Sequence, residues 1–540
     1  MSPFGIVLVA LLAVVASGLI GRVTRLPVPL VQMALGAALS MAGLALARFE
    51  PETFFLLYLA PLLFLDGWRI PKDALFRDAS TILTLALGLV AFTVLGMGLF
   101  IHALVPALPL AVAFALAAVI SPTDPVAVSA IAARTPIPPR LLHVLQGEAL
   151  LNDASGLVCM RFAVAAAVTG SFSLPQALAS FAWLALGGLA VGAAVTLAVA
   201  RLASWASAFG EDGGAQILVT LLMPFAVYLL AERLHCSGLL AVVAAGITMS
   251  LTDVWPWSAS TRLRRTAVWD TVQFAVNGSI FVLLGEQIPA LVAAAPVTVQ
   301  ATGHTAAAWL LVDVVLIVAA LAVLRFAWVG VSLKLRILGR RRRGDPPLDA
   351  DWRVVLVASL CGVRGAVTLA GVMTLPLLLG DGTPFPGRDL AIALAAGVIL
   401  LSLVLASATL PHALRGLARP ASPAAQTAED KMRRAAAEAA IAAVRSAATT
   451  LGAANGERRR HDEAAARIVA LYRAQIERLD RPAPAAMRER DDRVERRLRR
   501  VGLRAERHEL LRYGREHHIA DLTLRGIVRE LDLLETHHGG

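Results

Sequence analysis

The sequence predicts an all-α polytopic membrane protein that ends in a helical cytosolic domain. Three observations support this fold class. Hydrophobic residues make up 57% of the 540-residue chain and charged residues only 16%, with a mean hydropathy of +0.68. Apolar runs recur at lengths that suit a hydrocarbon core, which takes about 20 helical residues to cross. After Leu417 the composition changes abruptly to charged residues alternating with Ala and Leu.

The apolar runs define thirteen candidate transmembrane helices. Backbone polar groups must be satisfied internally in hydrocarbon, so Gly or Pro interruptions within a span need a cavity lined by protein. The first run lacks a preceding basic segment, and we interpret it as a retained span rather than a signal peptide. The expected spans are 4–21, 27–47, 53–68, 79–104, 107–132, 141–169, 175–203, 214–232, 235–252, 266–289, 305–336, 351–379 and 388–416.

Lys and Arg residues are distributed unevenly between the connections. Alternate connections carry 18 of them, whereas the others carry only Arg48, Arg233 and Arg388. Basic residues favour the cytoplasmic side of a membrane, so we expect the N-terminus outside and the tail in the cytoplasm. This alternation requires an odd number of spans. It also explains the net charge of +11 better than nucleic acid binding does.

Two domains follow from these patterns: a transmembrane domain at 1–417 and a cytoplasmic α-helical tail at 418–540. The tail holds amphipathic helical patterns that break at Pro482 and Pro484, and six of the eleven histidines. Histidine titrates near neutral pH, so these residues could sense pH, but a solvated helix surface is the simpler explanation. The three cysteines lie in apolar runs without metal-ligand spacing and are read as packing residues.

Two prolines bracket a polar pair in the fifth expected span, where Thr123 and Asp124 lie between Pro122 and Pro125. Each proline removes a backbone donor and disfavours helix at the residue before it. A carboxylate at bilayer depth needs a partner or a cavity. The pattern therefore predicts an unwound stretch whose carbonyls, with the Thr123 hydroxyl, offer oxygen ligands to a hard cation.

The sixth expected span contains a second polar cluster. Glu148 and Asn152 are four residues apart and share a helix face, and Asp153 follows directly. Such a cluster can bind a cation or a proton, and in an exchanger one carboxylate must hold either of them. The alternative is a structural role, because polar contacts between membrane helices are common.

Two arginines lie within later spans. Arg364 is flanked by Gly362 and Gly365, which permit a second broken helix, and its charge could neutralise helix C-terminal dipoles that meet there. Arg325 lies deep in the eleventh span and needs an acidic partner. Our candidate is Asp66 in the third span, in a structural ion pair rather than a transporting one.

Together these motifs resemble the signature of the sodium/proton exchangers of the monovalent cation:proton antiporter superfamily. The resemblance rests on Ser-Pro-Thr-Asp-Pro-Val at 121–126, Gly-Glu at 147–148 with Asn-Asp-Ala at 152–154, and Gly-Val-Arg-Gly-Ala at 362–366. It covers roughly residues 1–416 and is strongest to the bacterial NhaP-type antiporters, which are related to animal sodium/hydrogen exchangers. The resemblance implies two inverted six-helix repeats, crossed discontinuous helices and a homodimer.

The resemblance also implies a role for each site residue. Asp153 would carry either the proton or the cation, and Asn152 would help to set the site. Glu148 and the Thr123 main chain would contribute to cation coordination, so Asp153 and Thr123 are the expected Na⁺ ligands. Asp124 would stabilise the crossing of the fifth and twelfth helices and bond across to Asn152.

The remaining implied roles are structural. Arg364, with Pro122 and Pro125, would maintain the helix crossing and balance its charge. The pairing of Arg325 with Asp66 would match an arginine and acidic pair of the family, although many relatives have Glu at the latter position.

A second departure is Ala149, where many relatives have a Ser whose hydroxyl is a ligand. Ion preference therefore stays open. Family members with an Asn-Asp pair, as at 152–153, usually exchange one cation for one proton. A single carboxylate that carries either ion gives loaded states of equal charge, so electroneutral exchange is expected.

We therefore expect an antiporter, not an enzyme, that exchanges Na⁺ or Li⁺ for H⁺ across a bacterial inner membrane in pH and sodium homeostasis. It needs no cofactor, and its partners are these ions, K⁺ as a possible substrate, membrane lipid and a second copy of the chain, without nucleic acid. The alternatives are a K⁺/H⁺ antiporter, an organic anion symporter, for which a basic cavity is expected, and a signalling protein that uses its basic tail.

Overall fold

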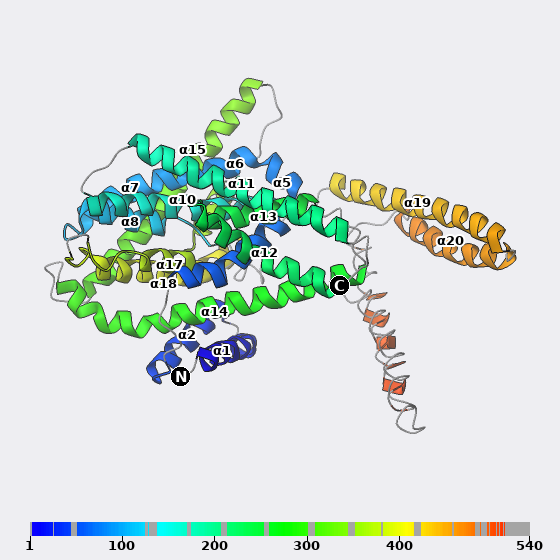
Figure 1. The fold of residues 1–540 in the computed structure, drawn as a ribbon, viewed down its shortest axis with the longest axis horizontal. Coiled ribbons are helices and arrows are strands. Elements are labelled where there is room, and N and C mark those ends of the chain that lie inside the picture. The colour runs from blue at the N-terminus through cyan, green and yellow to red at the C-terminus, as the bar shows by residue number, and fades with distance from the viewer. Residues whose placement is uncertain are drawn as a thin grey trace. The chain divides into compact units, whose positions relative to one another are not determined.

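The chain forms two compact units, Met1–Ala418 and Arg419–Gly540, which divide one residue after the predicted boundary. In the second unit, α19 (Pro423–Asn455) and α20 (Arg458–Asp480) lie side by side as a helical hairpin (Figure 1). The computed structural model describes residues 3–24, 26–44, 51–124, 128, 138–169, 174–206, 213–252, 259–300, 308–343, 352–379, 382–414, 423–455, 458–480 and a set of residues between 487 and 512.

The first unit is helical, apart from an isolated bridge between Leu378 and Pro384 in its described part. Every predicted span overlaps at least one described helix. The helices are α1 (Pro3–Thr24), α2 (Val28–Met41), α3 (Pro51–Phe54), η1 (Phe55–Leu59), α4 (Ala60–Arg69), α5 (Lys72–Arg77), α6 (Ala79–Leu83), η2 (Thr84–Leu89), α7 (Val90–Leu104), α8 (Leu110–Ile120), α10 (Pro139–Thr169), α11 (Leu174–Ala206), α12 (Gly213–Arg233), α13 (Gly238–Thr252), α14 (Ala259–Gln300), α15 (Ala308–Arg343), α16 (Trp352–Leu360), α17 (Ala366–Met373) and α18 (Arg388–Ala413).

The length and composition of these helices are those of a multi-pass membrane protein. In the part of the chain that the structure describes, seven helices are long and apolar enough to cross a bilayer, and four further apolar helices are shorter. The short ones include α8, which ends where the proline-rich segment begins. The number of crossings, thirteen, stays a prediction.

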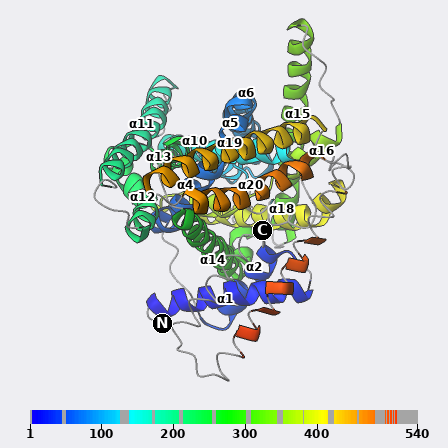
Figure 2. The ribbon, with the colours of Figure 1, turned by 90° about the vertical axis from the view of Figure 1, so that its right-hand side faces the viewer.

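The helices of the first unit gather into two groups. In one, α1 and α2 lie against α14 (Figures 1 and 2), and α4, α11 and α12 surround α13. In the other, α7, α8 and α10 pack together and are joined by α15 to α18. The largest buried cluster belongs mainly to the second group and a smaller one mainly to the first. Figure 2 shows α11 and α12 on one side of the molecule and α15 and α16 on the other.

Two helices of the second group are interrupted, as the Pro and Gly patterns predicted. The chain is non-helical from Ser121 to Asp124 after α8, and from Cys361 to Gly365 between α16 and α17. These two breaks meet: the Asp124 N–H donates to the Val363 carbonyl over 2.8 Å. Backbone groups freed by the breaks are thus partly satisfied by each other, as hydrocarbon requires.

Close packing between α2 and α14 depends on glycine. A Cβ added at Gly285 would lie 2.7 Å from the Met33 carbonyl carbon, which is backbone and cannot rotate away. Gly285→Ala is therefore expected to force the two helices apart and to lower the free energy of unfolding by roughly 1–3 kcal/mol.

Thermal unfolding of the purified protein in detergent measures this effect. Gly330→Ala on α15 is the matched control, because a Cβ there meets nothing within 4 Å. Equal unfolding temperatures for the two variants would show that the α2–α14 contact does not limit stability.

Candidate functional site

A cavity of about 430 Å³ lies between the two helix groups of the first unit. Its wall on one side comes from α4 and α14, and on the other from the segment after α8, from α10 and from the start of α17. Three carboxylate residues line it, Asp66, Asp124 and Asp153, while Arg69 is the one basic residue in its described lining. The cavity is thus predominantly acidic, which suits a cation and not an organic anion.

Asp153 on α10 meets the conditions for an exchangeable carboxylate. Its side chain is 7% exposed and lines the cavity. Within the described part of the chain it forms no hydrogen bond or ion pair. The neighbouring carboxylates of Asp66 and Asp124 are close enough to repel it electrostatically. A buried carboxylate without a protein partner needs a proton or a cation to offset its desolvation.

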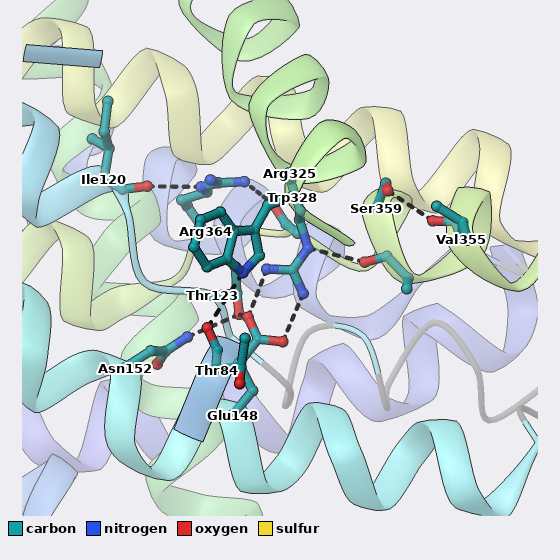
Figure 3. Close-up of polar contacts among 12 residues, drawn as sticks. Thr84, Ile120, Thr123, Glu148, Asn152, Arg325, Trp328, Val355, Ser359 and Arg364 are labelled. Carbon is teal, nitrogen blue, oxygen red and sulfur yellow. Dashed lines mark hydrogen bonds and ion pairs between the residues drawn. The ribbon is translucent and has the colours of Figure 1, made fainter. Parts of the chain in front are cut away.

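Glu148 faces away from the cavity and forms a buried ion pair with Arg325. The distances from Arg325 Nη1 to Glu148 Oε1 and from Nη2 to Oε2 are 2.6 Å and 2.8 Å, so the pair is bidentate (Figure 3). Arg325 Nε also donates to the Ala358 carbonyl over 2.9 Å. Both side chains are almost fully buried. The pair joins α10 to α15 and α16.

This pairing corrects two expectations. Arg325 does not pair with Asp66, which lies in the cavity wall instead, and both oxygens of Glu148 are engaged by a guanidinium rather than offered to a cation. The reason is helical geometry. On α10 the cavity side is formed by positions 146, 149, 150 and 153, whereas positions 148 and 152 form a different stripe.

Thr123 links this second stripe to the broken helix. Asn152 Nδ2 donates to Thr123 Oγ1 over 3.1 Å, and Thr123 Oγ1 donates to Glu148 Oε1 over 3.3 Å (Figure 3). Asn152 therefore bonds to Thr123, and the predicted bond from Asp124 to Asn152 is wrong. The Thr123 hydroxyl is therefore engaged within the protein.

Asp124 lies at the helix crossing, where we expected it. A Cβ added at Gly365 would lie 2.6 Å from the Asp124 Cβ, so only glycine leaves room for this side chain. Pro122 lines the cavity and packs against Gly156 of α10. Pro125, also predicted to belong to the crossing, lies outside the described residues.

Arg364 contacts the C-terminal ends of both interrupted helices. Its Nε donates to the carbonyl of Ile120, the last residue of α8, over 2.8 Å, and its Nη1 donates to the Gly362 carbonyl just after α16 (Figure 3). Its backbone N–H donates to Ser402 Oγ on α18 over 3.2 Å. A guanidinium at this place offsets the partial negative charge of the two helix ends.

Several cavity residues were not found from the sequence. Gln273 and Asn277 of α14 line the cavity opposite Asp153, and so does Arg69 at the end of α4. The two amides are four residues apart on one helix face within the tenth predicted span. This polar stripe in an apolar segment is the sequence pattern that could have identified the two residues as cavity-lining.

An acidic cavity beside two crossed, interrupted helices in a multi-pass membrane bundle is the architecture of a secondary transporter. The comparisons with known proteins agree. Residues 7–416 match the model of the transmembrane sodium/hydrogen exchangers. The chain therefore belongs to the sodium/hydrogen exchanger family, whose members are antiporters rather than enzymes.

Individual relatives are also cation/proton exchangers or antiporters by name. The chain is 39% identical to the uncharacterized Na⁺/H⁺ exchanger YjcE of Escherichia coli over 99% of its length and 98% of that protein. It is 43% identical to the sodium, potassium, lithium and rubidium/H⁺ antiporter of Bacillus subtilis over 76% of its length and 61% of that protein. The fold is similar to that of the sodium proton antiporter MjNhaP1 from Methanocaldococcus jannaschii, with a TM-score of 0.55, 18% identity, and coverage of 77% of this chain and 99% of that one.

The ion pair between Glu148 and Arg325 provides a test of the site's structure. Glu148→Gln leaves a buried guanidinium without its counter-charge, and Arg325→Met leaves a buried carboxylate. Each single variant is expected to lose roughly 3–5 kcal/mol of stability, and the double variant to recover a large part of that loss.

A double-mutant cycle on thermal unfolding in detergent measures the coupling between the two side chains. Asp66→Asn is the control, since our corrected assignment gives it no coupling to Arg325→Met. Additive losses for Glu148 and Arg325, or coupling of Arg325 to Asp66, would contradict the assignment.

Proposed function

We propose that this chain exchanges Na⁺ or Li⁺ for H⁺, with Asp153 as the shared site. The observation that carries the proposal is a buried cavity carboxylate that has no partner side chain among the described residues and lies beside a helix crossing. A proton and a monovalent cation each neutralise this carboxylate, and they exclude one another there. Membership of the exchanger family and the printed names of the relatives support the same activity.

The other residues have distinct tasks in this proposal. The Thr123 main chain supplies oxygen next to Asp153, and Asp66 adds a second carboxylate from the opposite wall. Glu148 does not coordinate the ion directly, because Arg325 holds both of its oxygens. Asn152 and Thr123 connect that ion pair to the helix crossing. These bonds hold the stripe of α10 next to the one that carries Asp153, and so help to position Asp153.

Electroneutral exchange follows if Asp153 alone changes its load. One proton or one monovalent cation on the same carboxylate gives two loaded states of equal charge. The membrane potential then contributes little to the transport step. The charges of Asp66 and Asp124 stay constant through the cycle in this scheme.

K⁺ is a second candidate substrate, and one observation favours it. Ala149 lines the cavity where a hydroxyl-bearing residue would add a ligand. A site with fewer fixed ligands discriminates less by size, since ion selectivity depends on ligand number and cavity rigidity. The Bacillus subtilis relative is named for sodium, potassium, lithium and rubidium. A broad range of monovalent cations is therefore the main alternative to Na⁺ alone.

We further propose the membrane arrangement that the sequence predicts: thirteen spans with two inverted repeats in a bacterial inner membrane, an external N-terminus, and a homodimer. The bias of basic residues between the connections supports the orientation. The tail from 418 to 540 is proposed to be cytoplasmic and regulatory, with ion exchange carried by residues 1–417.

Reconstitution in liposomes with an internal pH dye tests the exchange. Addition of Na⁺ or Li⁺ is expected to dissipate an imposed proton gradient, and Asp153→Asn is expected to reduce the signal to that of protein-free liposomes. Asp389→Asn is the matched control, because Asp389 is 84% exposed at the start of α18.

The pattern of responding ions decides between the candidates. A K⁺ response equal to that for Na⁺ would assign the broader range. Exchange that persists in Asp153→Asn would show that Asp153 is not the shared site, and silence to every cation would contradict antiport.

A further inference from the structure

Arg69 is an unexpected residue in a cavity meant for cations. It ends α4, lines the cavity, and lies three residues after Asp66, on the same helix face. Its charge is close enough to act on the Asp66 carboxylate. A guanidinium this near could bind that carboxylate itself and compete with the transported ion.

The Arg69 side chain is instead held by two residues of α14. Its Nη2 lies 2.5 Å from Asp270 Oδ1, and its Nη1 donates to Gln273 Oε1 over 2.8 Å. Asp270 and Gln273 are three residues apart and thus share the helix face that looks toward α4. Both terminal nitrogens of the guanidinium are therefore engaged by side chains of α14.

The neighbouring contacts fix α4 against α14. The Arg265 guanidinium of α14 lies 4.4 Å from the centre of the Trp68 ring, and Phe64 stacks on Trp269 with ring centres 5.7 Å apart. These contacts hold the end of α4, which carries Arg69, beside the face of α14 that carries the two acceptors. Since Arg69 and Asp270 are 36% and 58% exposed, the ion pair contributes little to stability, and its role lies elsewhere.

We propose that Asp270 and Gln273 are positioning residues that tether Arg69 away from the cavity carboxylates, so that it does not occupy the cation site as an internal competitor. This inference rests on the proposed antiport. It makes α14 a determinant of apparent cation affinity through its hold on Arg69. A freed Arg69 that covers Asp66 four-fifths of the time would leave about one-fifth of the sites competent and raise the apparent KM about five-fold.

The liposome assay, run over a range of Na⁺ concentrations, tests the tether. Asp270→Asn and Gln273→Leu are each expected to raise the apparent KM for Na⁺ several-fold with little change in maximal rate, because saturating Na⁺ displaces the competitor. Addition of Arg69→Gln to either variant is expected to return KM to within about two-fold of the wild type, since no competitor remains. Gln273→Leu is the more decisive of the two single variants, because it removes an acceptor for Arg69 without changing the net charge, whereas Asp270→Asn also removes a negative charge.

Three outcomes would overturn the tether. Unchanged KM in both single variants would show that Arg69 is not restrained by these residues. A raised KM that Arg69→Gln does not reverse would mean that Asp270 attracts cations, or that Gln273 binds them, without any part played by Arg69. Failure of the wild type to exchange any cation would refute the proposed function and the tether together, whereas the first two outcomes leave the antiport intact.

Discussion

The buried ion pair between Glu148 and Arg325 determines how the rest of the site is organised. It neutralises two charges that would otherwise be too costly in the membrane interior, and it joins α10 to α15 and, through the Ala358 carbonyl, to α16. This pair uses both oxygens of Glu148, whereas Asp153, on the stripe that faces the cavity, has no partner in the part of the chain that the structure describes. An ion-paired carboxylate and one that lines the cavity thus lie five residues apart on a single helix.

The helix crossing solves a second problem, which is how the backbone groups freed at the helix breaks find partners. The chain leaves helical structure after α8 and between α16 and α17, and the backbone groups freed there need partners in a membrane interior. The bond from Asp124 to Val363 satisfies part of that need, and Arg364 satisfies the carbonyls at both C-terminal ends. The second group of helices therefore provides one wall of the cavity, while α4 and α14 provide the opposite wall.

The helix breaks and the charged residues of the site could be predicted from local chemistry in the sequence. The pairing of side chains across helices could not, because it depends on tertiary geometry. The helix breaks follow from Pro and Gly at fixed positions, and intramembrane charge pointed to Asp153. The partner of Arg325 depends instead on how α10 is rotated relative to α15, so choosing Asp66 over Glu148 was wrong. The amides of α14, such as Asn277, were missed because neutral polar residues barely alter the hydropathy of a span. Helical periodicity around Asp153 would have separated the two stripes.

The central claim is that one carboxylate holds either a proton or a cation. Proton release on Na⁺ binding tests it most directly, with purified protein in weakly buffered detergent solution at a pH where the site is protonated. We expect about one proton released per chain at saturating Na⁺, and none from Asp153→Asn. Na⁺ binding to the wild type without proton release, or equal release from the variant, would contradict the account.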